Sequence, residues 1–308
     1  MRKRRRSRRR QKPKGHFTHL DKIFWPQERF TKGDVIRYYD RMADVILPYL
    51  RNRPMVLNRH PNGIRGASFF QKNVDPKHLP PFVKTIAVRA RSTGRNVHYV
   101  ICNNKRTLLY LANLGCIEMH PWNSRTSSIR NPDFLSLDLD PGGNPFGDVV
   151  KVARAVRDVI EAAGGRCLVK TSGKTGIHVI LPLRPRHDFA EVRAAAKTIA
   201  RIVNRRLPKL TTRRPNAGRH SRKIYIDYVR NSIGQTLAAP YSLRAFPAAT
   251  VSTPLAWRDL STSLRPSRYT LRTTSRRLNR EGDIWRSAFR HSVNLKRLVT
   301  RLRRMAET

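Results

Sequence analysis

The chain of 308 residues is long enough for one large domain or for two lobes around a sizeable core, and 39% of its residues are hydrophobic. Its 64 Lys and Arg residues outnumber 20 Asp and Glu, which gives a formal net charge of +44. Nucleic acid is the partner that best matches this excess, because basic side chains release counterions from phosphates. A membrane-spanning protein is not expected, since no apolar stretch approaches the ~20 residues that a span needs.

Cysteine usage and the first residues bear on organisation. Three widely spaced cysteines form no CxxC pair, so neither a disulfide framework nor a zinc site is expected, and a reducing cytoplasm is the natural setting.

The start, MRKRRRSRRRQKPKG, lacks the apolar segment of a secretory signal. Its run of like charges predicts a disordered tail that contacts nucleic acid, with added solubility as the alternative. We expect a basic tail over 1–15, one folded domain over 16–300 and a C-terminal tail over 301–308.

Helical and strand patterns alternate along the first half of the chain. Apolar residues at helical spacing predict a helix over 32–50, and an apolar run predicts a strand and turn over 54–63. The segment 63–73 carries two adjacent aromatic residues. A hairpin with the basic tip RSTGRN is expected over 86–102, and a short buried helix over 107–116.

The second half predicts a strand, a long amphipathic helix ended by two glycines, two strands joined by SGKTG, another helix and a further strand. These segments span 134–140, 146–165, 166–171, 177–183, 191–207 and 224–228. The Arg-rich stretch from residue 261 predicts two peripheral helices. Helices interleaved with strands and hairpins indicate an α+β (mixed α/β) fold.

The segment FLSLDLDPGG places Asp138 and Asp140 one residue apart inside an apolar run. In a strand, the three leucines would face a core, and both carboxylates would share the other face, about 7 Å apart at ~3.3 Å per residue. Unpaired carboxylates repel each other, so a cation is expected between them. The following PGG turn leaves the pair at the end of the strand, open to a ligand.

A third acid lies in IYIDY, where Asp227 occupies the polar face of another strand. Two acids from one strand and one from a second form the minimal cage for two Mg²⁺ or Mn²⁺ ions, which sit ~3.5–4 Å apart and clamp the oxygens of a phosphoryl transfer. Oxygen ligands suit these hard cations. The alternative is that each acid is an ordinary surface residue paired with an arginine.

The loop in TSGKTGIHV contains GKT but is no Walker A motif, because Leu168 stands where a glycine is required and a strand follows. A glycine-rich turn between strands can still bind phosphate oxygens through its backbone N–H groups. Ser172, Lys174 and His178 would add charge and hydrogen bonds there. An ordinary hairpin turn with a surface lysine is the alternative.

Four other residues could contact a nucleotide or a nucleic acid. Arg244 could bind a triphosphate through two N–H groups. Phe69 and Phe70 could stack on bases, and at most one of them should lie in the core, because neighbours on a strand face opposite ways. His120, in EMHPW, could contact a sugar or a phosphate, although a lone histidine is more often a partly buried structural residue.

Six segments in order resemble the polymerase domain of bacterial ligase D, the primase-polymerase of non-homologous end joining: LDKIFWP, FFQKN, MHPW, FLSLDLDP, TSGKTGIHV and IDYVRNSIGQTLAAPYSLRA. The resemblance covers about residues 16–300. That domain belongs to the archaeo-eukaryotic primase superfamily. The resemblance therefore implies a primase-type catalytic core with mixed sheets flanked by helices, a two-metal site for Mn²⁺ or Mg²⁺ and a preference for ribonucleotides.

The resemblance also implies a role for each matching residue. The metal-binding acids match Asp138, Asp140 and Asp227, and the triphosphate-binding residues match Ser172, His178 and Arg244. A histidine near the nucleotide sugar matches His120. The two lysines that hold the 5′-phosphate of the downstream strand match Lys22 and Lys32, and the aromatics at the template and primer match Phe69 and Phe70.

Three departures from the family pattern stand out. Many relatives have Ser-Gly-x-Lys-Gly, whereas here the lysine comes one position earlier, so either Lys174 or Thr175 faces phosphate. His19 replaces an asparagine in the expected 5′-phosphate pocket. His-Ser-Arg precedes the strand that carries Asp227, where relatives tend to have Arg-x-Gly, so Arg219 or Arg222 would substitute.

The implied activity is DNA-directed nucleotidyl transfer that fills gaps and extends 3′ ends at double-strand breaks. Expected partners are gapped or broken DNA with a 5′-phosphate and nucleoside triphosphates, with a Ku homologue and a DNA ligase as candidates; no membrane partner is expected. Two alternatives are a catalytically weak end-bridging protein and a true primase. No ligase or phosphoesterase motif is present, so we expect a stand-alone polymerase or an excised domain, located in the cytoplasm at the nucleoid.

Overall fold

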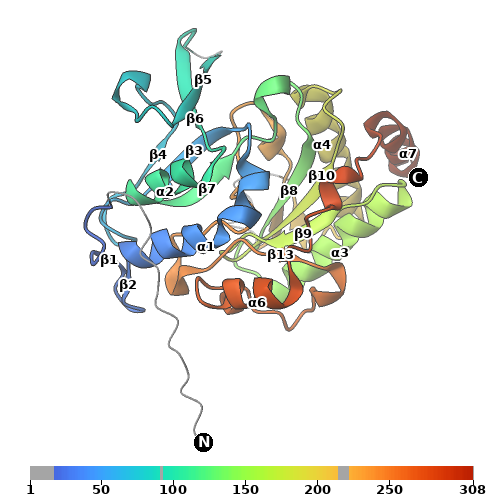
Figure 1. Cartoon of the computed structure of the whole chain (residues 1–308). Coiled ribbons are helices and arrows are strands. Elements are labelled where there is room, and N and C mark those ends of the chain that lie inside the picture. Colours follow the sequence, from blue (N-terminus) through green and yellow to red (C-terminus); the bar gives the residue numbers. More distant parts are fainter. Residues whose placement is uncertain (1–16, 91–92, 214–221, 308) are drawn as a thin grey trace, which may run out of the picture.

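Two β-sheets with helices around them form the body of the protein (Figure 1). The computed structural model describes residues 17–90, 93–213 and 222–307. The predicted tail over 1–15, part of the hairpin tip at 91–92 and Arg219 lie outside these ranges. Among the described residues, no helix is long and apolar enough to cross a bilayer.

The larger sheet has six strands and a mixed arrangement. Its neighbours are antiparallel except for the parallel pair β11–β12. The strands, in order across the sheet, are β11 (Thr211–Thr212), β12 (Ile224–Asp227), β8 (Phe134–Asp140), β10 (Ile177–Pro182), β9 (Leu168–Thr171) and β13 (Pro254–Leu255).

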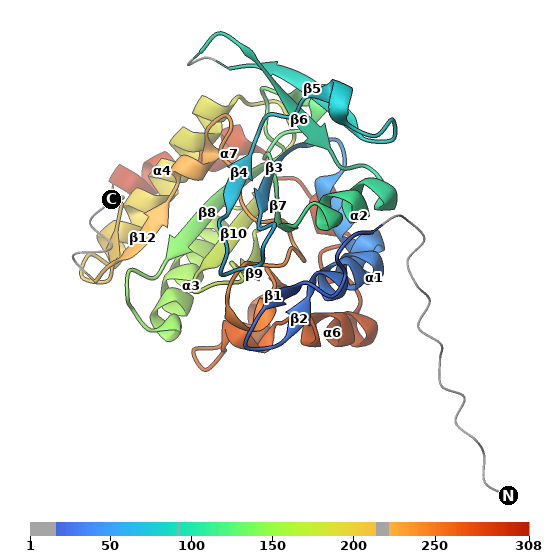
Figure 2. The ribbon, with the colours of Figure 1, turned by 90° about the vertical axis from the view of Figure 1, so that its left-hand side faces the viewer.

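The smaller sheet is antiparallel and is built from the first 121 residues. Four strands follow one path across it, and a fifth pairs with β3; they are β4 (Phe69–Gln71), β3 (Pro54–Arg59), β6 (Asn96–Ile101), β5 (Lys84–Arg89) and β7 (Cys116–Pro121). The predicted hairpin is β5–β6, which projects from the body in Figures 1 and 2. A separate two-stranded sheet contains β1 (Ile23–Trp25) and β2 (Phe30–Thr31).

The helices fall into two groups that cover the two sheets (Figure 2). Near the smaller sheet, α1 packs against α2 and α6, while α3, α4 and α7 lie at the larger sheet. Their bounds are α1 (Lys32–Leu50), α2 (Lys105–Asn113), α3 (Phe146–Ala162), α4 (Phe189–Arg206), α6 (Thr273–Glu281) and α7 (Leu295–Glu307). The mixed α+β prediction is confirmed.

The strand β8 shows how the sequence places its residues on two faces. Leu135, Leu137 and Leu139 are fully buried in one core with apolar residues of α3 and α4. The alternation of side chains along a strand then turns Ser136, Asp138 and Asp140 to the opposite face. This second face looks toward the smaller sheet and carries the polar residues described below.

The C-terminal boundary differs from the sequence prediction. α7 continues through 301–307, and Leu302 is fully buried with Leu295 and Leu298 in the core of the larger sheet. These leucines recur at intervals of three and four residues, so they form one apolar stripe, and that stripe packs against α4. Residues 301–307 are therefore part of the folded domain, not a tail.

Candidate active site

Four polar residues stand side by side on four adjacent strands of the larger sheet. Asp227 on β12 pairs with Asp138 on β8, Asp138 with His178 on β10, and His178 with Lys170 on β9. Directly opposed residues of neighbouring strands interact through their side chains. His178 Nε2 lies 3.2 Å from Asp138 Oδ1, and Lys170 Nζ lies 2.6 Å from His178 Nδ1. We call these four residues the transverse row.

Burial sets the protonation of this row. Burial, and then the charge of Lys170, lower the pKa of His178 to about 4, so the ring is neutral at pH 7. The neutral ring then donates Nε2–H to Asp138 and accepts from Lys170 at Nδ1. Burial alone would raise the pKa of Asp138, but the neighbouring His178 and Arg230 outweigh it and bring that pKa to about 2. Asp138 is therefore an ionised, oriented carboxylate.

The other two acids have a different electrostatic state. Burial, and then the charges of Asp138 and Asp227, raise the pKa of Asp140 to about 7. Burial also raises the pKa of Asp227, which accepts hydrogen bonds at Oδ1 from the Val229 amide, at 2.8 Å, and the Tyr225 hydroxyl, at 3.3 Å. Three carboxylates thus share a small polar surface at one end of β8 and β12. Such crowding favours a cation, because each carboxylate disfavours ionisation of the others.

Arg230, in the turn after β12, supplies positive charge to this cluster. Its Nε lies 3.1 Å from Asp227 Oδ2 and 3.5 Å from Asp138 Oδ2. Within the described ranges, no three His, Cys, Asp or Glu side chains are gathered as a metal site. The oxygen donors nevertheless match what Mg²⁺ and Mn²⁺ prefer. The guanidinium therefore lies where the donor chemistry calls for a cation.

The loop between β9 and β10 is held in a tight turn beside this cluster. Ser172 Oγ accepts hydrogen bonds from the backbone amides of Lys174, at 3.1 Å, and Gly176, at 3.0 Å. Gly173 has φ +77°, and a Cβ there would lie 2.6 Å from the Arg244 side chain and 2.7 Å from the Ser252 amide. Only glycine fits this position without strain. Arg244 in turn donates to the Ser172 carbonyl.

Glu118 on β7 joins the loop to the smaller sheet, although the sequence analysis did not select it. Its Oε1 lies 3.2 Å from Arg244 Nε and 3.7 Å from Lys174 Nζ, and its Oε2 lies 2.8 Å from His120 Nε2. Burial opposes its ionisation, but Arg244, His120 and Lys174 hold the pKa of Glu118 well below its usual range. Lys174 thus points toward this cluster, whereas Thr175 is exposed.

Phe69 and Phe70 lie on β4 and are 46% and 59% exposed. Neither is in the core, which agrees with the prediction that at most one would be. The Phe70 ring meets the His120 ring edge-on, with centroids 5.8 Å apart, whereas Phe69 lies under the Arg59 guanidinium. Phe70 is therefore the aromatic that adjoins the candidate nucleotide-binding residues.

Lys22 and Lys32 form a second basic cluster. The Lys32 backbone amide donates to the Lys22 carbonyl at 2.8 Å, and Lys32 Nζ donates to the Thr18 carbonyl at 2.7 Å. Lys22 Nζ donates to Asn62 Oδ1. Burial, and then the charge of Lys22, lower the pKa of Lys32. His19 has φ +53°, a conformation that Asn and His adopt more readily than most residues.

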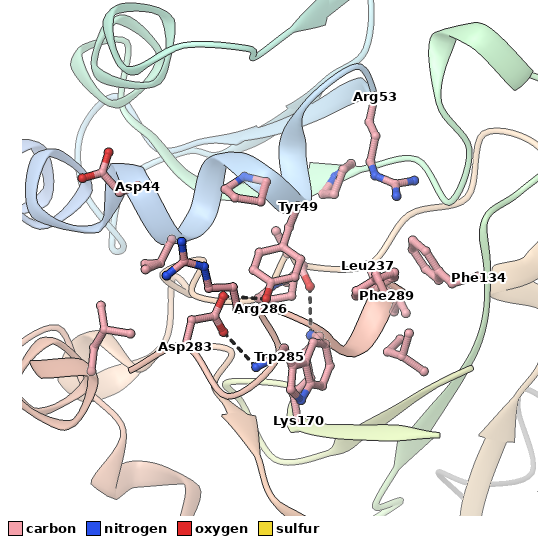
Figure 3. A pocket seen from close by; sticks show the side chains of 18 of the residues that line it. Asp44, Tyr49, Arg53, Phe134, Lys170, Leu237, Asp283, Trp285, Arg286 and Phe289 are labelled. Atoms are coloured by element: carbon pink, nitrogen blue, oxygen red, sulfur yellow. Dashed lines mark hydrogen bonds between the residues drawn. The ribbon is translucent and has the colours of Figure 1, made fainter. Parts of the chain in front are cut away.

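Lys170 also borders a cavity of about 580 Å³ on the side of the sheet that faces α1 (Figure 3). Tyr49, Trp285 and Phe289 are among its aromatic lining, and Asp283 accepts from the Tyr49 hydroxyl at 2.7 Å. None of the candidate acids lines this cavity. Lys170 Nζ also donates to the Ala238 carbonyl at 2.9 Å and to Ser252 Oγ. These contacts fix the Lys170 amino group behind His178, and burial, followed by the charge of Arg244, lowers its pKa well below the usual value for lysine.

Three charged residues of the site escaped the sequence analysis: Glu118, Lys170 and Arg230. Each had a usable signal. Glu118 lies two residues before His120, on the same face of its strand, and Lys170 is a basic residue inside a short, largely buried strand. Arg230 lies three residues after Asp227, which brings the two side chains together in a helical turn.

Comparisons with known proteins agree with this geometry. The family model of the LigD primase-polymerase domain matches residues 31–285. The bifunctional non-homologous end joining protein LigD of Bacillus subtilis is 35% identical over 274 residues, which are 88% of this chain and 43% of that protein. The multifunctional LigD of Mycobacterium tuberculosis H37Rv is 32% identical over 300 residues, 94% of this chain and 39% of that protein. The chain thus spans about two fifths of the length of these curated relatives.

A solved structure provides a fold match as well. The polymerase domain of M. tuberculosis ligase D in complex with DNA aligns with a TM-score of 0.83 and 28% identity, and the alignment covers 91% of this chain and 99% of that one. The family model, the relatives and this structure together show that the chain belongs to the LigD primase-polymerase domain family.

Proposed function

We propose that the chain adds nucleotides, preferably ribonucleotides, to the 3′ end of a DNA primer at gaps and double-strand breaks. The observation that carries the proposal is the transverse row, in which a neutral His178 orients the ionised Asp138 beside two further acids. The match to a LigD polymerase domain in complex with DNA supports DNA as the substrate. A Ku homologue and a DNA ligase are proposed partners on the family resemblance.

Asp138, Asp140 and Asp227 would hold two Mn²⁺ or Mg²⁺ ions. When bound, the ions would polarise the α-phosphate and lower the pKa of the primer 3′-hydroxyl. The protein itself binds and orients. His178 and Lys170 fix the Asp138 carboxylate at Oδ1, so its other oxygen, Oδ2, faces Arg230 and the acid cluster. Asp140, with a pKa near 7, accepts a proton more readily than an ordinary aspartate.

Phosphate binding would fall to the loop between β9 and β10 and to Arg244. An arginine binds phosphate oxygens through paired N–H groups, and so can the backbone N–H groups of a tight turn other than those of Lys174 and Gly176, which already donate to Ser172 Oγ. Lys174 and Arg244 reach the same carboxylate, Glu118, so they are held at one place. We assign Lys174, not the exposed Thr175, to the triphosphate.

The ribonucleotide preference would come from His120. Glu118 Oε2 accepts a hydrogen bond from its Nε2, so Nδ1 of the neutral ring is an acceptor. Burial lowers the pKa of His120, which keeps the ring neutral. An acceptor there would select a sugar that carries a 2′-hydroxyl, and Phe70 packs edge-on against the same ring.

One observation favours the second candidate, a catalytically weak end-bridging protein. Arg230 pairs with Asp138 and Asp227, so the two acids are already neutralised in part. The presence of all three acids favours an enzyme over a protein that only bridges ends.

A true primase is the other alternative. It would start a chain on the template without any primer, so a reaction that omits the primer separates that activity from gap filling.

Primer extension with Mn²⁺ tests the proposal. Asp138→Ala, Asp140→Ala and Asp227→Ala should each abolish extension and keep most of the affinity for DNA, because affinity comes mainly from Lys and Arg. Asp148→Ala is a matched control, since this acid lies on α3 and forms an ion pair with Lys151, the only one it makes within the described residues. Near-normal extension by any one of the three variants would remove that acid from the proposed site. If the wild-type chain binds DNA but adds no nucleotide, the end-bridging alternative holds.

A further inference from the structure

A hollow on the far side of the larger sheet carries a second basic site. Its volume is about 680 Å³, and its lining comes from the loop that follows α3, from Arg184 just beyond β10, and from the segment that leads into α7 with the first turns of that helix. Four guanidinium groups converge there from these three segments. They belong to Arg166, Arg184, Arg297 and Arg301 and are called the arginine groove below.

The arginine groove lacks compensating acids. No described Asp or Glu lines it, whereas Asp or Glu side chains line four other hollows in the described part of the chain. The four side chains make no ion pair or hydrogen bond with any residue in 17–90, 93–213 or 222–307. Elsewhere on the surface arginines do pair, as Arg37 does with Asp34 and Arg157 with Asp158. Four like charges around one hollow repel each other, so the arrangement is stabilised when an anion enters.

Backbone geometry supports the same reading. Gly164 follows α3 with φ +77°, and a Cβ there would overlap the Arg301 guanidinium. The glycine therefore lets Arg301 approach the C-terminal end of α3, where a cation is favoured. On the other side, Asn294 Oδ1 accepts from the Arg297 amide at the start of the 13-residue α7. The N-terminus of a helix attracts negative charge.

The groove lies at the opposite end of the sheet from the candidate acids. Val293 bridges to Leu183, which follows β10, and Pro182 pairs with Phe134 at the start of β8. Asp140 lies six residues farther along β8, so the two ends are about 20 Å apart at ~3.3 Å per residue. The groove is thus separate from the residues assigned above to the primer and the incoming nucleotide.

We propose that the arginine groove binds the phosphate backbone of duplex DNA outside the gap. Arg166, Arg184 and Arg297 are exposed, which suits contacts that follow a line of phosphates more than a closed cradle around one phosphate ion. A protein partner is disfavoured, because protein interfaces have an apolar centre with few charges and this lining is mainly arginine. Duplex DNA rises 3.4 Å per base pair, so about six base pairs span the ~20 Å to the acids.

Salt titration of DNA binding tests the proposal without any need for catalysis. Binding of a fluorescent 30-base-pair duplex with a one-nucleotide gap is measured by anisotropy over a salt series. Each phosphate contact contributes about −0.9 to the slope of log K against log salt. Replacing all four groove arginines by glutamine should flatten the slope by two or more units. Replacing them by lysine should retain most of it.

A second quadruple variant controls for total charge. Arg258, Arg265, Arg268 and Arg276 are exposed on the Arg-rich C-terminal part, and their change to glutamine removes the same four charges. This control should flatten the slope by less than one unit. Equal slopes for the two glutamine variants would overturn the proposal that the groove binds DNA. It would also be overturned if inorganic phosphate raised the melting temperature of the wild type but not of the groove glutamine variant, while the two had the same salt slope for DNA. Unfolding curves of each variant verify that the fold is retained.

Discussion

Arg230 makes a specific prediction about metal binding. Arg230→Gln removes a positive charge that lies 3.1 Å from Asp227 and 3.5 Å from Asp138. Two unit charges about 4 Å apart interact by about 4 kcal/mol at an effective dielectric of ~20 and by about 1 kcal/mol in water. Because the Arg230 side chain is 36% exposed, the lower part of this range applies, about 1–2 kcal/mol. Mn²⁺ should therefore bind about 5- to 30-fold more tightly to the variant.

Calorimetric titration of Mn²⁺ at pH 8, without DNA or nucleotide, measures this change. The pH is chosen because the pKa of Asp140 is about 7 and Arg230 lowers it, so the variant needs a higher pH to keep this acid ionised. Arg157→Gln is the matched control, since this arginine pairs with acids on α3. The reasoning is refuted if Arg230→Gln binds Mn²⁺ no more tightly than the wild type, or if Arg157→Gln gains as much.

Three further predictions concern other parts of the chain. Lys22→Ala with Lys32→Ala should remove the preference for gapped DNA with a 5′-phosphate over a 5′-hydroxyl, because a phosphate dianion needs charge-assisted contacts; equal discrimination by wild type and variant would place the pocket elsewhere. Glu118→Gln should cost about 3–5 kcal/mol in denaturant unfolding at pH 7, since it breaks a buried ion pair. The folded-state pKa of Glu118 lies well below 4.5, so its contribution is present above about pH 4.5 and is lost as the pH falls further; stability curves of equal steepness below pH 5 would contradict this. Leu302→Ala should cost about 2–5 kcal/mol and Arg303→Ala within about 0.5 kcal/mol; equal costs would mean that the end of α7 does not pack.

The acids and the nucleotide loop could be predicted because local rules decide their placement. The alternation in FLSLDLD sets which face Asp138 occupies, and the following turn places the pair at a strand end. The spacing of glycines in the loop after β9 likewise fixes a tight turn. These signals need no knowledge of which strands pair. They hold in the structure for the same reason, since burial of the three leucines leaves β8 only one register.

The residues of the site that the sequence did not predict owe their positions to the pairing of strands that lie far apart in the chain. Lys170 acts behind His178 because β9 lies beside β10, and Glu118 reaches Arg244 across 126 positions because β7 belongs to the other sheet. A single charged residue in a strand carries no sign of its partner. The end of α7 was missed for a related reason. Its leucines are sparse among arginines, and only contact with α4 shows that they are buried.

The transverse row also limits where the chain tolerates insertions. One residue inserted into β8 before Asp138 would turn both aspartates toward the leucine core, because successive strand residues face opposite ways. The same insertion in the turn at 141–145 would leave all four members opposite one another, since β10 and β12 align β8 through their own ladders. Variation in length should therefore gather in the connections around the site and avoid the four strands that carry it. Backbone amides of these strands should also exchange with solvent only when the whole domain unfolds.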